Sequence, residues 1–205
     1  MIAYHFVGTT LRDGSPIPSD GVWLKHDGPC VMCESGLHAS RHPFDALQYA
    51  LGNTLCLVEV RDIVSEQGDK LVCRERMIIR RIDATDLCRS FARKCALDVA
   101  HLWDMPAVVR AYLETGDESM RDAAWNAAWA ARAAWAAGDA AWAAGAPGDA
   151  GAPGDAARAA RAAWAAGDAG DAAKQKQRDK FEELVNRAFS EGAPASSHTP
   201  GRDMP

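Results

Sequence analysis

The 205 residues of this chain are enough for one medium-sized domain and an extension, and the composition changes near Gly116 in the way such a division predicts. The net charge of −5 is spread over both parts, with 13 basic and 15 acidic residues up to Gly116 and 10 and 13 after it. Because neither part is strongly basic, composition gives no support to nucleic-acid binding through bulk phosphate contacts.

The chain opens on a strand-like run at residues 1–5 that has neither the basic nor the apolar region of a secretory signal. The later tract of Ala and Trp is interrupted by Arg, Asp or Gly every few residues, so we expect no membrane span and no membrane partner. Six cysteines without an export signal favour a reducing compartment, and we predict a cytoplasmic protein whose cysteines are mostly free thiols.

Short apolar segments separated by turn formers predict a sheet in the first part of the chain. We expect strands at residues 2–7, 22–25, 31–32, 54–60 and 71–82. Pro43 is suited to the first turn of a helix, with Ser40 as the expected cap and Gly52 and Asn53 just past its end.

A strongly amphipathic pattern follows the last of these strands. Apolar residues recur every three or four positions, and this predicts a helix that starts at Thr85 or Asp86 and is broken by Pro106. A further helical segment is expected at residues 107–113. We therefore predict an α+β domain over residues 1–116, with a small, mainly antiparallel sheet and flanking helices.

The second part of the chain repeats a short motif of Trp, Ala, Ala and Gly, most clearly at residues 135–139, 142–146 and 164–168. A capping-box pattern at residues 115–118 starts a helix, a Gly/Pro segment at residues 145–156 interrupts it, and a later apolar stripe includes Phe181 and Phe189. We predict an Ala/Trp-rich helical hairpin over residues 117–191 and a disordered tail at residues 192–205.

Alanine lets two helices approach closely, and tryptophan supplies most of the apolar surface in this part of the chain. We expect the rings to be buried between the helices, with the stripe from Phe181 to Phe189 on the facing surface. The extension is then a spacer or an interaction surface for a host protein or a second copy of the chain. Its candidate contact residues are Trp125, Trp129, Trp135, Trp142 and Trp164.

Two cysteines at Cys30 and Cys33 have the spacing of half a zinc site, which His26, His38 or His42 would have to complete. No second cysteine pair has that spacing, and the remaining cysteines fit the role of small core residues. We therefore predict no metal.

Several arginines crowd the strand expected at residues 71–82. Arg74, Arg76 and Arg80 fall on one face of a regular strand and could contact phosphates, or they could form a solvated face balanced by Glu75. Ser40 next to two histidines also invites a nucleophile assignment, but adjacency in sequence does not make a triad, and we predict the helix-capping role for this residue.

Residues 33–49, followed by the apolar strand at 54–60, resemble an uncharacterised domain family of bacteriophages and prophages. The shared motif is Gly-Leu/Phe-His-Ala-Ser/Cys before a Pro-Leu/Phe-Asp helix, here at residues 36–45, and members often carry C-terminal Ala/Trp repeats. The resemblance implies a protein of a phage or prophage that works in the bacterial host cell.

The same strand–helix–strand segment more distantly resembles the ADP-ribosyltransferase fold. That resemblance implies NAD as a cofactor, with His5, His38 and Glu75 as catalytic residues. The corresponding ligand-binding candidates are Ser40, Tyr49, Arg74 and Arg76.

Three functions follow as hypotheses. The first is a non-enzymatic phage or prophage accessory protein that binds a host protein or a small ligand near His38, with antagonism of host defence as one setting. The second is an NAD-using ADP-ribosyltransferase. The third is a structural or assembly protein of the virion, in which the extension acts as a helical element.

Overall fold

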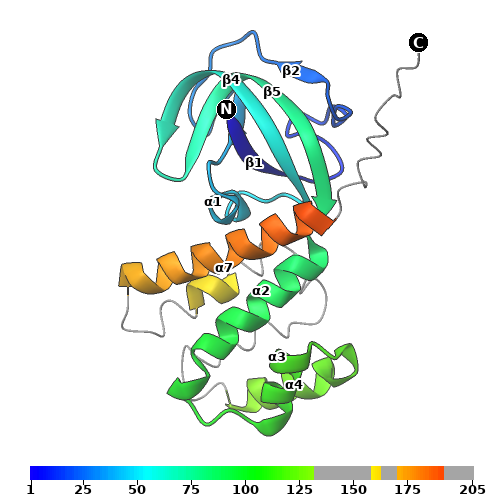
Figure 1. Ribbon diagram of the computed structural model, residues 1–205, viewed down its shortest axis with the longest axis vertical. Helices are drawn as coiled ribbons and strands as arrows, with labels where there is room; N and C mark the ends of the chain where they lie inside the picture. The colour runs from blue at the N-terminus through cyan, green and yellow to red at the C-terminus, as the bar shows by residue number, and fades with distance from the viewer. Residues whose placement is uncertain (132–157, 163–169, 192–205) are drawn as a thin grey trace, which may run out of the picture.

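The computed structural model describes residues 1–131, 158–162 and 170–191 (Figure 1). A five-stranded antiparallel sheet lies against a layer of helices, so the predicted α+β class with a helical C-terminal region is confirmed. The repeats around Trp135, Trp142 and Trp164, the loop at 145–156 and the tail at 192–205 lie outside the described residues. No helix within the described ranges has the length and apolar character needed to cross a membrane.

The sheet is built around one long hairpin. Strands β4 (Thr54–Gln67) and β5 (Lys70–Asp83) pair along their whole length, and β1 (Ile2–Val7) pairs with the free side of β4. The other side of β5 carries β2 (Trp23–Lys25) and then β3 (Leu37–Ala39). The strand expected at residues 31–32 is wrong, because Val31 makes only an isolated bridge to Ser35.

Two backbone hydrogen bonds close this sheet into a small barrel. The amide of Tyr4 donates to the carbonyl oxygen of Ser40 at 2.8 Å, and the amide of Ser40 donates back at 2.9 Å. Because Tyr4 lies in β1 and Ser40 directly follows β3, the ring runs through β1, β4, β5 and β3. Small and aliphatic residues of these strands form the buried interior cluster: Ala3, Val7, Ala39, Cys56, Val58, Val60, Leu71, Cys73 and Ile78.

The closure corrects the predicted role of Ser40. This residue is only 2 % exposed, and it is held in the bridge to β1. Helix α1 (Pro43–Leu47) starts at a proline as predicted, but the residue before it is His42, and no side chain caps the helix.

An irregularity in the hairpin corrects the predicted arginine face. Val60 lies opposite Arg76 and Val58 lies opposite Ile78, but the register then shifts, so that Leu57 lies opposite Arg80. The extra residue on β5 turns Arg80 to the other face of the strand. Its guanidinium lies 5.7 Å from the ring centre of Phe189, on the side of the helices.

The helical layer forms after the hairpin. Its helices are α2 (Thr85–Asp98), the short 3-10 helix Ala100–Leu102, α3 (Ala107–Thr115), the 3-10 helix Glu118–Met120, α4 (Arg121–Ala131) and α7 (Gly170–Glu191). Residues 158–162 are also helical. Gly116 ends α3 in the left-handed conformation, with φ of +69°. The cap of the next turn is Asp117, which accepts from Ser119, and not Thr115 as the capping-box pattern predicts.

Helix α7 crosses α1 and α2 and buries its apolar stripe against them (Figure 1). The ring of Phe181 lies 4.8 Å from that of Phe91 and 6.4 Å from that of Phe44. The stripe therefore packs on α1 and α2, while Trp135, Trp142 and Trp164, which we expected in the same hairpin, lie outside the described residues. In α4 the buried side chains are Ala124 and Ala128, while Trp129 is 54 % exposed.

Polar side chains on one side of α7 hold the helix at this position. Arg178 binds Asp45 at 2.8 Å, Lys180 binds both oxygens of Asp98 at 2.7 Å, and Glu182 lies 2.6 Å from Nδ1 of His42. Asp45 is 1 % exposed, and burial raises the pKa of its carboxyl group, whereas Arg178 opposes that shift. A carboxylate so deeply buried depends on its cation.

We expect Arg178→Met to lower the free energy of unfolding by about 3 kcal/mol at pH 7, because it leaves the ionised Asp45 buried without its cation. The loss should shrink as the pH falls and Asp45 becomes protonated, since the neutral acid needs no cation. Urea unfolding measures both effects. Arg187→Met is the matched control on the same helix, because it removes an exposed pair with Glu183. Equal losses for the two variants would contradict this account.

Phe181→Ala should lower the free energy of unfolding by about 3 to 5 kcal/mol, since it leaves a cavity next to two other buried rings. Leu51→Ala is the control, because Leu51 is among the most exposed apolar residues, and we expect a change below about 0.5 kcal/mol. Thermal and urea unfolding of the full chain give both values. A small loss for Phe181→Ala would mean that α7 is not part of the cooperative core.

Candidate functional site

A buried arginine is the most unusual charged group of the barrel. Arg76 is 6 % exposed, and it lies opposite Val60 of β4 and Leu24 of β2. One of its nitrogens, Nη1, donates to the carbonyl oxygen of His38. Burial lowers the pKa of this guanidinium to about 10, and the thiols of Cys73 and Cys56 oppose the shift. The group stays charged at neutral pH, inside a largely apolar barrel.

Two histidines lie close to this guanidinium. The pKa of His5 is lowered well below its ordinary value of 6.5, first by burial and then by the positive charges of Arg76 and His38. The pKa of His38 is lowered by burial and by Arg76, Arg12 and Lys70, while a hydrogen bond with the Gly36 backbone opposes the shift. Both rings are therefore neutral at pH 7.

Hydrogen bonding assigns the tautomer of His38. Its Nε2 lies 3.0 Å from the backbone amide of Cys33, which can only donate, so Nε2 must accept. The proton of the neutral ring then sits on Nδ1. This hydrogen bond ties the ring of His38, a residue of β3, to the loop at Cys33. The backbone carbonyl group of the same residue accepts from Arg76.

No carboxylate balances this cluster within the described part of the chain. The charged groups that shift the pKa values of Arg76, His5 and His38 are other cations and thiols, with no Asp or Glu among them. An unpaired buried charge is costly, and proteins normally pair such a charge. In a chain of net charge −5 this uncompensated positive site is unexpected, and its chemistry suits an anion.

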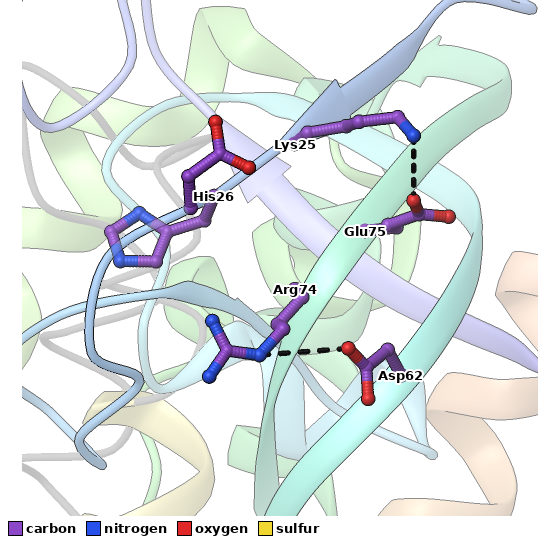
Figure 2. Close-up of a pocket in the computed structure, with 6 residues that line it drawn as sticks. Lys25, His26, Asp62, Arg74 and Glu75 are labelled. Atoms are coloured by element: carbon purple, nitrogen blue, oxygen red, sulfur yellow. Dashed lines mark ion pairs between the residues drawn. The ribbon is translucent and has the colours of Figure 1, made fainter.

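Arg74 and Glu75 are separated from this cluster. They line a shallow pocket of about 210 Å³ with Lys25, His26, Asp27 and Asp62 (Figure 2). Its two cations are each paired: Lys25 lies 2.8 Å from Glu75, and Arg74 lies 3.5 Å from Asp62. Arg74 also donates to the carbonyl oxygen of Gly28 at 2.9 Å. Both cations of the pocket are already paired with carboxylates, so it offers less to an anionic ligand than the site at Arg76.

Tyr49 lies at a third position, in the turn after α1, where its exposed side chain reaches the tip of the β4–β5 hairpin. Its hydroxyl donates to Asp69, and the ammonium of Lys70 lies 4.9 Å from the centre of its ring. Of the predicted site residues, the structure thus brings together His5, His38 and Arg76, with the Ser40 backbone next to β1. It does not bring Glu75, Arg74 or Tyr49 to them.

The cysteines gather no metal site among the described residues. No group of three or more His, Cys, Asp or Glu side chains there could hold a metal ion. Cys56, Cys73, Cys88 and Cys95 are buried, Cys30 is half-buried and Cys33 is exposed. The four buried thiols have the core role that the sequence suggests.

Sequence reasoning missed Arg12, Lys70 and Cys33 as neighbours of His38. They come from a loop, from the hairpin turn and from the segment before β3, so no local motif links them. Only the closure of the barrel places these segments around one histidine.

Residues 1–90 match a family model whose description is Domain of unknown function (DUF7666). The matched segment runs from β1 into α2, so it holds the whole sheet and the cluster of Arg76, His5 and His38. No curated protein and no solved structure matches the chain, and so no known fold adds to this comparison.

Protonation of the two histidines should limit stability in acid. Because their folded-state pKa values lie below 6.5, the unfolded chain takes up protons below that pH and the folded chain does not. Stability should therefore fall as the pH drops from about 6.5, by up to roughly 1.4 kcal/mol per pH unit for each histidine. His5→Gln removes one titrating group. We therefore expect its free energy of unfolding in urea to depend less steeply on pH between pH 7.5 and 5 than that of the parent protein. An unchanged slope would contradict the burial of His5.

Proposed function

We propose that the chain is a binding protein whose N-terminal domain holds a small ligand through an anionic phosphate or carboxylate group. The observation that carries the proposal is Arg76, a buried guanidinium with no carboxylate partner among the described residues. A planar guanidinium suits a two-point contact with an oxyanion. His38 and His5 add ring nitrogens beside it.

The histidines couple ligand binding to protons. Arg76 lowers the pKa of both rings, and a bound anion would offset its charge. Their pKa values rise when the anion is present, so a proton is taken up on binding. Affinity for the anion then increases as the pH falls from 7 towards 6.

The biological setting is a further proposal. The resemblance of residues 36–45 to a phage and prophage family supports an accessory protein of the bacterial host cytoplasm, with antagonism of host defence as one setting. The Trp-rich part of the chain is then the surface for a host protein or for self-association. The exposed Trp129 on α4 supports that assignment.

The NAD-using transferase is the alternative enzyme. The closeness of His5 and His38 to Arg76 supports this alternative, because a nucleotide pyrophosphate is an anion. Glu75 does not support it, because Glu75 is paired with Lys25 in the separate pocket (Figure 2). Transfer of labelled ADP-ribose from NAD to a lysate protein, lost in His38→Ala, would favour the enzyme over the binder.

Binding is tested by thermal unfolding and calorimetric titration of the full chain with inorganic phosphate, pyrophosphate and NAD. Sodium chloride at equal ionic strength corrects for screening. We expect a saturable rise in stability, of about 2.7 kcal/mol when the ligand is at a hundred times its Kd, and tighter binding at pH 6 than at pH 7.

Arg76→Met should abolish this effect while the protein stays folded, since replacing an unpaired buried charge by an apolar side chain of similar size is not expected to destabilise. Arg61→Met is the matched control, because Arg61 is an exposed arginine of β4 that pairs with Glu59. The proposal would be overturned if none of the ligands stabilised the parent protein in a saturable way, or if Arg76→Met and Arg61→Met lost this stabilisation equally.

A further inference from the structure

The shallow pocket on the barrel carries charges of both signs (Figure 2). Its volume is about 210 Å³, and the residues that line it are Lys25, His26, Asp27, Asp62, Arg74 and Glu75. Drug-sized ligands fill pockets of about 300 to 1,000 Å³, so an occupant of this pocket is a smaller molecule. Two cations and three carboxylates give the lining a formal charge of −1 when the histidine is counted as neutral.

The pair of Lys25 and Glu75 is built into the sheet. The two residues are register partners of β2 and β5, and their charged atoms lie 2.8 Å apart. Glu75 raises the pKa of the Lys25 ammonium, first through this hydrogen bond and then through its charge. Arg61, the register partner of Glu75 on β4, pairs with Glu59 at 2.9 Å and does not line the pocket. We therefore expect Lys25 and Glu75 to stay paired when a ligand enters.

The pair of Arg74 and Asp62 is looser. Nε of Arg74 lies 3.5 Å from Oδ2 of Asp62, whereas a charge-assisted hydrogen bond spans about 2.7 to 2.9 Å. Nη1 of Arg74 donates to the carbonyl oxygen of Gly28, and Nη2 makes no hydrogen bond with the described part of the chain. The Asp62 side chain is 63 % exposed. A ligand carboxylate can therefore take the Nε and Nη2 edge of Arg74 without breaking a hydrogen bond.

The backbone of Asp62 is strained. Its φ is +49°, in the left-handed region, although the residue lies inside β4 and not at its end. Residues other than glycine adopt this region at a cost, and such positions cluster at ligand sites. The strain at Asp62 is thus a second observation, independent of the charges, that marks this pocket.

Two more groups of the pocket are acceptors. Asp27 makes no hydrogen bond or ion pair with any residue in the described ranges, and its carboxylate is exposed. Nε2 of His26 lies 3.1 Å from the carbonyl oxygen of Pro29, which can only accept, so Nε2 carries a proton. In the neutral ring Nδ1 is then an acceptor. In Figure 2 the guanidinium of Arg74 lies between the carboxylate of Asp62 and the ring of His26.

We propose that this pocket binds a free basic amino acid such as lysine. The α-carboxylate of the ligand binds Arg74, its α-ammonium binds Asp62, and its side-chain ammonium binds Asp27. A simple anion would meet three carboxylates and a simple cation would meet two cations, whereas an amino acid keeps both charges of the loose pair partnered. The ligand's charge of +1 also balances the −1 of the lining.

This site shares no residue with the anion site. The amino-acid site consists of Arg74, Asp62 and Asp27, whereas the anion site consists of the Arg76 guanidinium with His5 and His38. Phosphate binding can therefore fail while lysine binds as proposed, and the reverse also holds.

The first experiment removes one charged group of the ligand at a time. L-Lysine is compared with 1,5-diaminopentane, which lacks the α-carboxylate, with 6-aminohexanoate, which lacks the α-ammonium, and with L-norleucine, which lacks the side-chain ammonium. Calorimetric titration of the full chain at pH 7 and constant ionic strength gives each Kd. We expect lysine to bind with a Kd of about 1 mM or tighter. Each analogue should bind at least about tenfold more weakly, since it loses a charge-assisted hydrogen bond. Absence of saturable lysine binding, or an analogue that binds as well as lysine, would overturn the proposal.

Variants of the pocket then locate the site. Asp62→Asn removes the charge and keeps the size, and asparagine tolerates the left-handed region, so the fold should be unchanged while lysine binds about tenfold more weakly. Glu66→Gln is the matched control, because Glu66 is an exposed carboxylate of β4 that pairs with Arg41 outside the pocket, and it should bind lysine like the parent. Urea unfolding checks that both variants are folded. An unchanged affinity in Asp62→Asn, or an equal loss in Glu66→Gln, would contradict the assignment.

Discussion

The two backbone hydrogen bonds between Tyr4 and Ser40 are the constraint on which the rest of the N-terminal domain depends. Without them, the sheet has a free edge at β1 and another at β3. With them, β1 and β3 become neighbours, and His5 and His38, which stand at the two ends of a loop-rich segment, both lie close to Arg76. The geometry of the candidate site is thus a consequence of barrel closure.

Closure also explains why the charge of Arg76 is unusual. In an open sheet its guanidinium would reach water, but the barrel surrounds it with aliphatic side chains and thiols. Retaining a charge there without a carboxylate works against stability. A site that lowers stability is one at which binding is expected. The shallow pocket at Arg74 has no unpaired cation of this kind, because both of its cations lie close to carboxylates.

Local patterns predicted much of this fold. The strands at 2–7 and 71–82, the helix from Thr85 and the proline start of α1 follow from alternation, periodicity and the fixed φ of proline. The long-range pairing of strands could not be predicted from such patterns, because they describe only neighbouring residues. The local pattern predicts Ser40 as a helix cap, but the residue pairs with β1. It also predicts Arg80 on the same face as Arg76, but the register shift places Arg80 on the other face. The contact of Lys70 with Cys33 joins two loops, which no periodicity links.

Helix α7 lies far beyond residues 1–90 in sequence, yet the matched segment needs a cover of this kind. Phe44 and Phe91 bury their rings against Phe181, and the carboxylate of Asp45 binds Arg178. Removed from α7, the segment would expose the ring of Phe44 and leave Asp45 without its cation. A fragment of residues 1–90 is therefore a poor test of ligand binding, because loss of binding could reflect loss of this cover. The full chain keeps the barrel and its supporting helix together, so a negative result there bears on Arg76 itself.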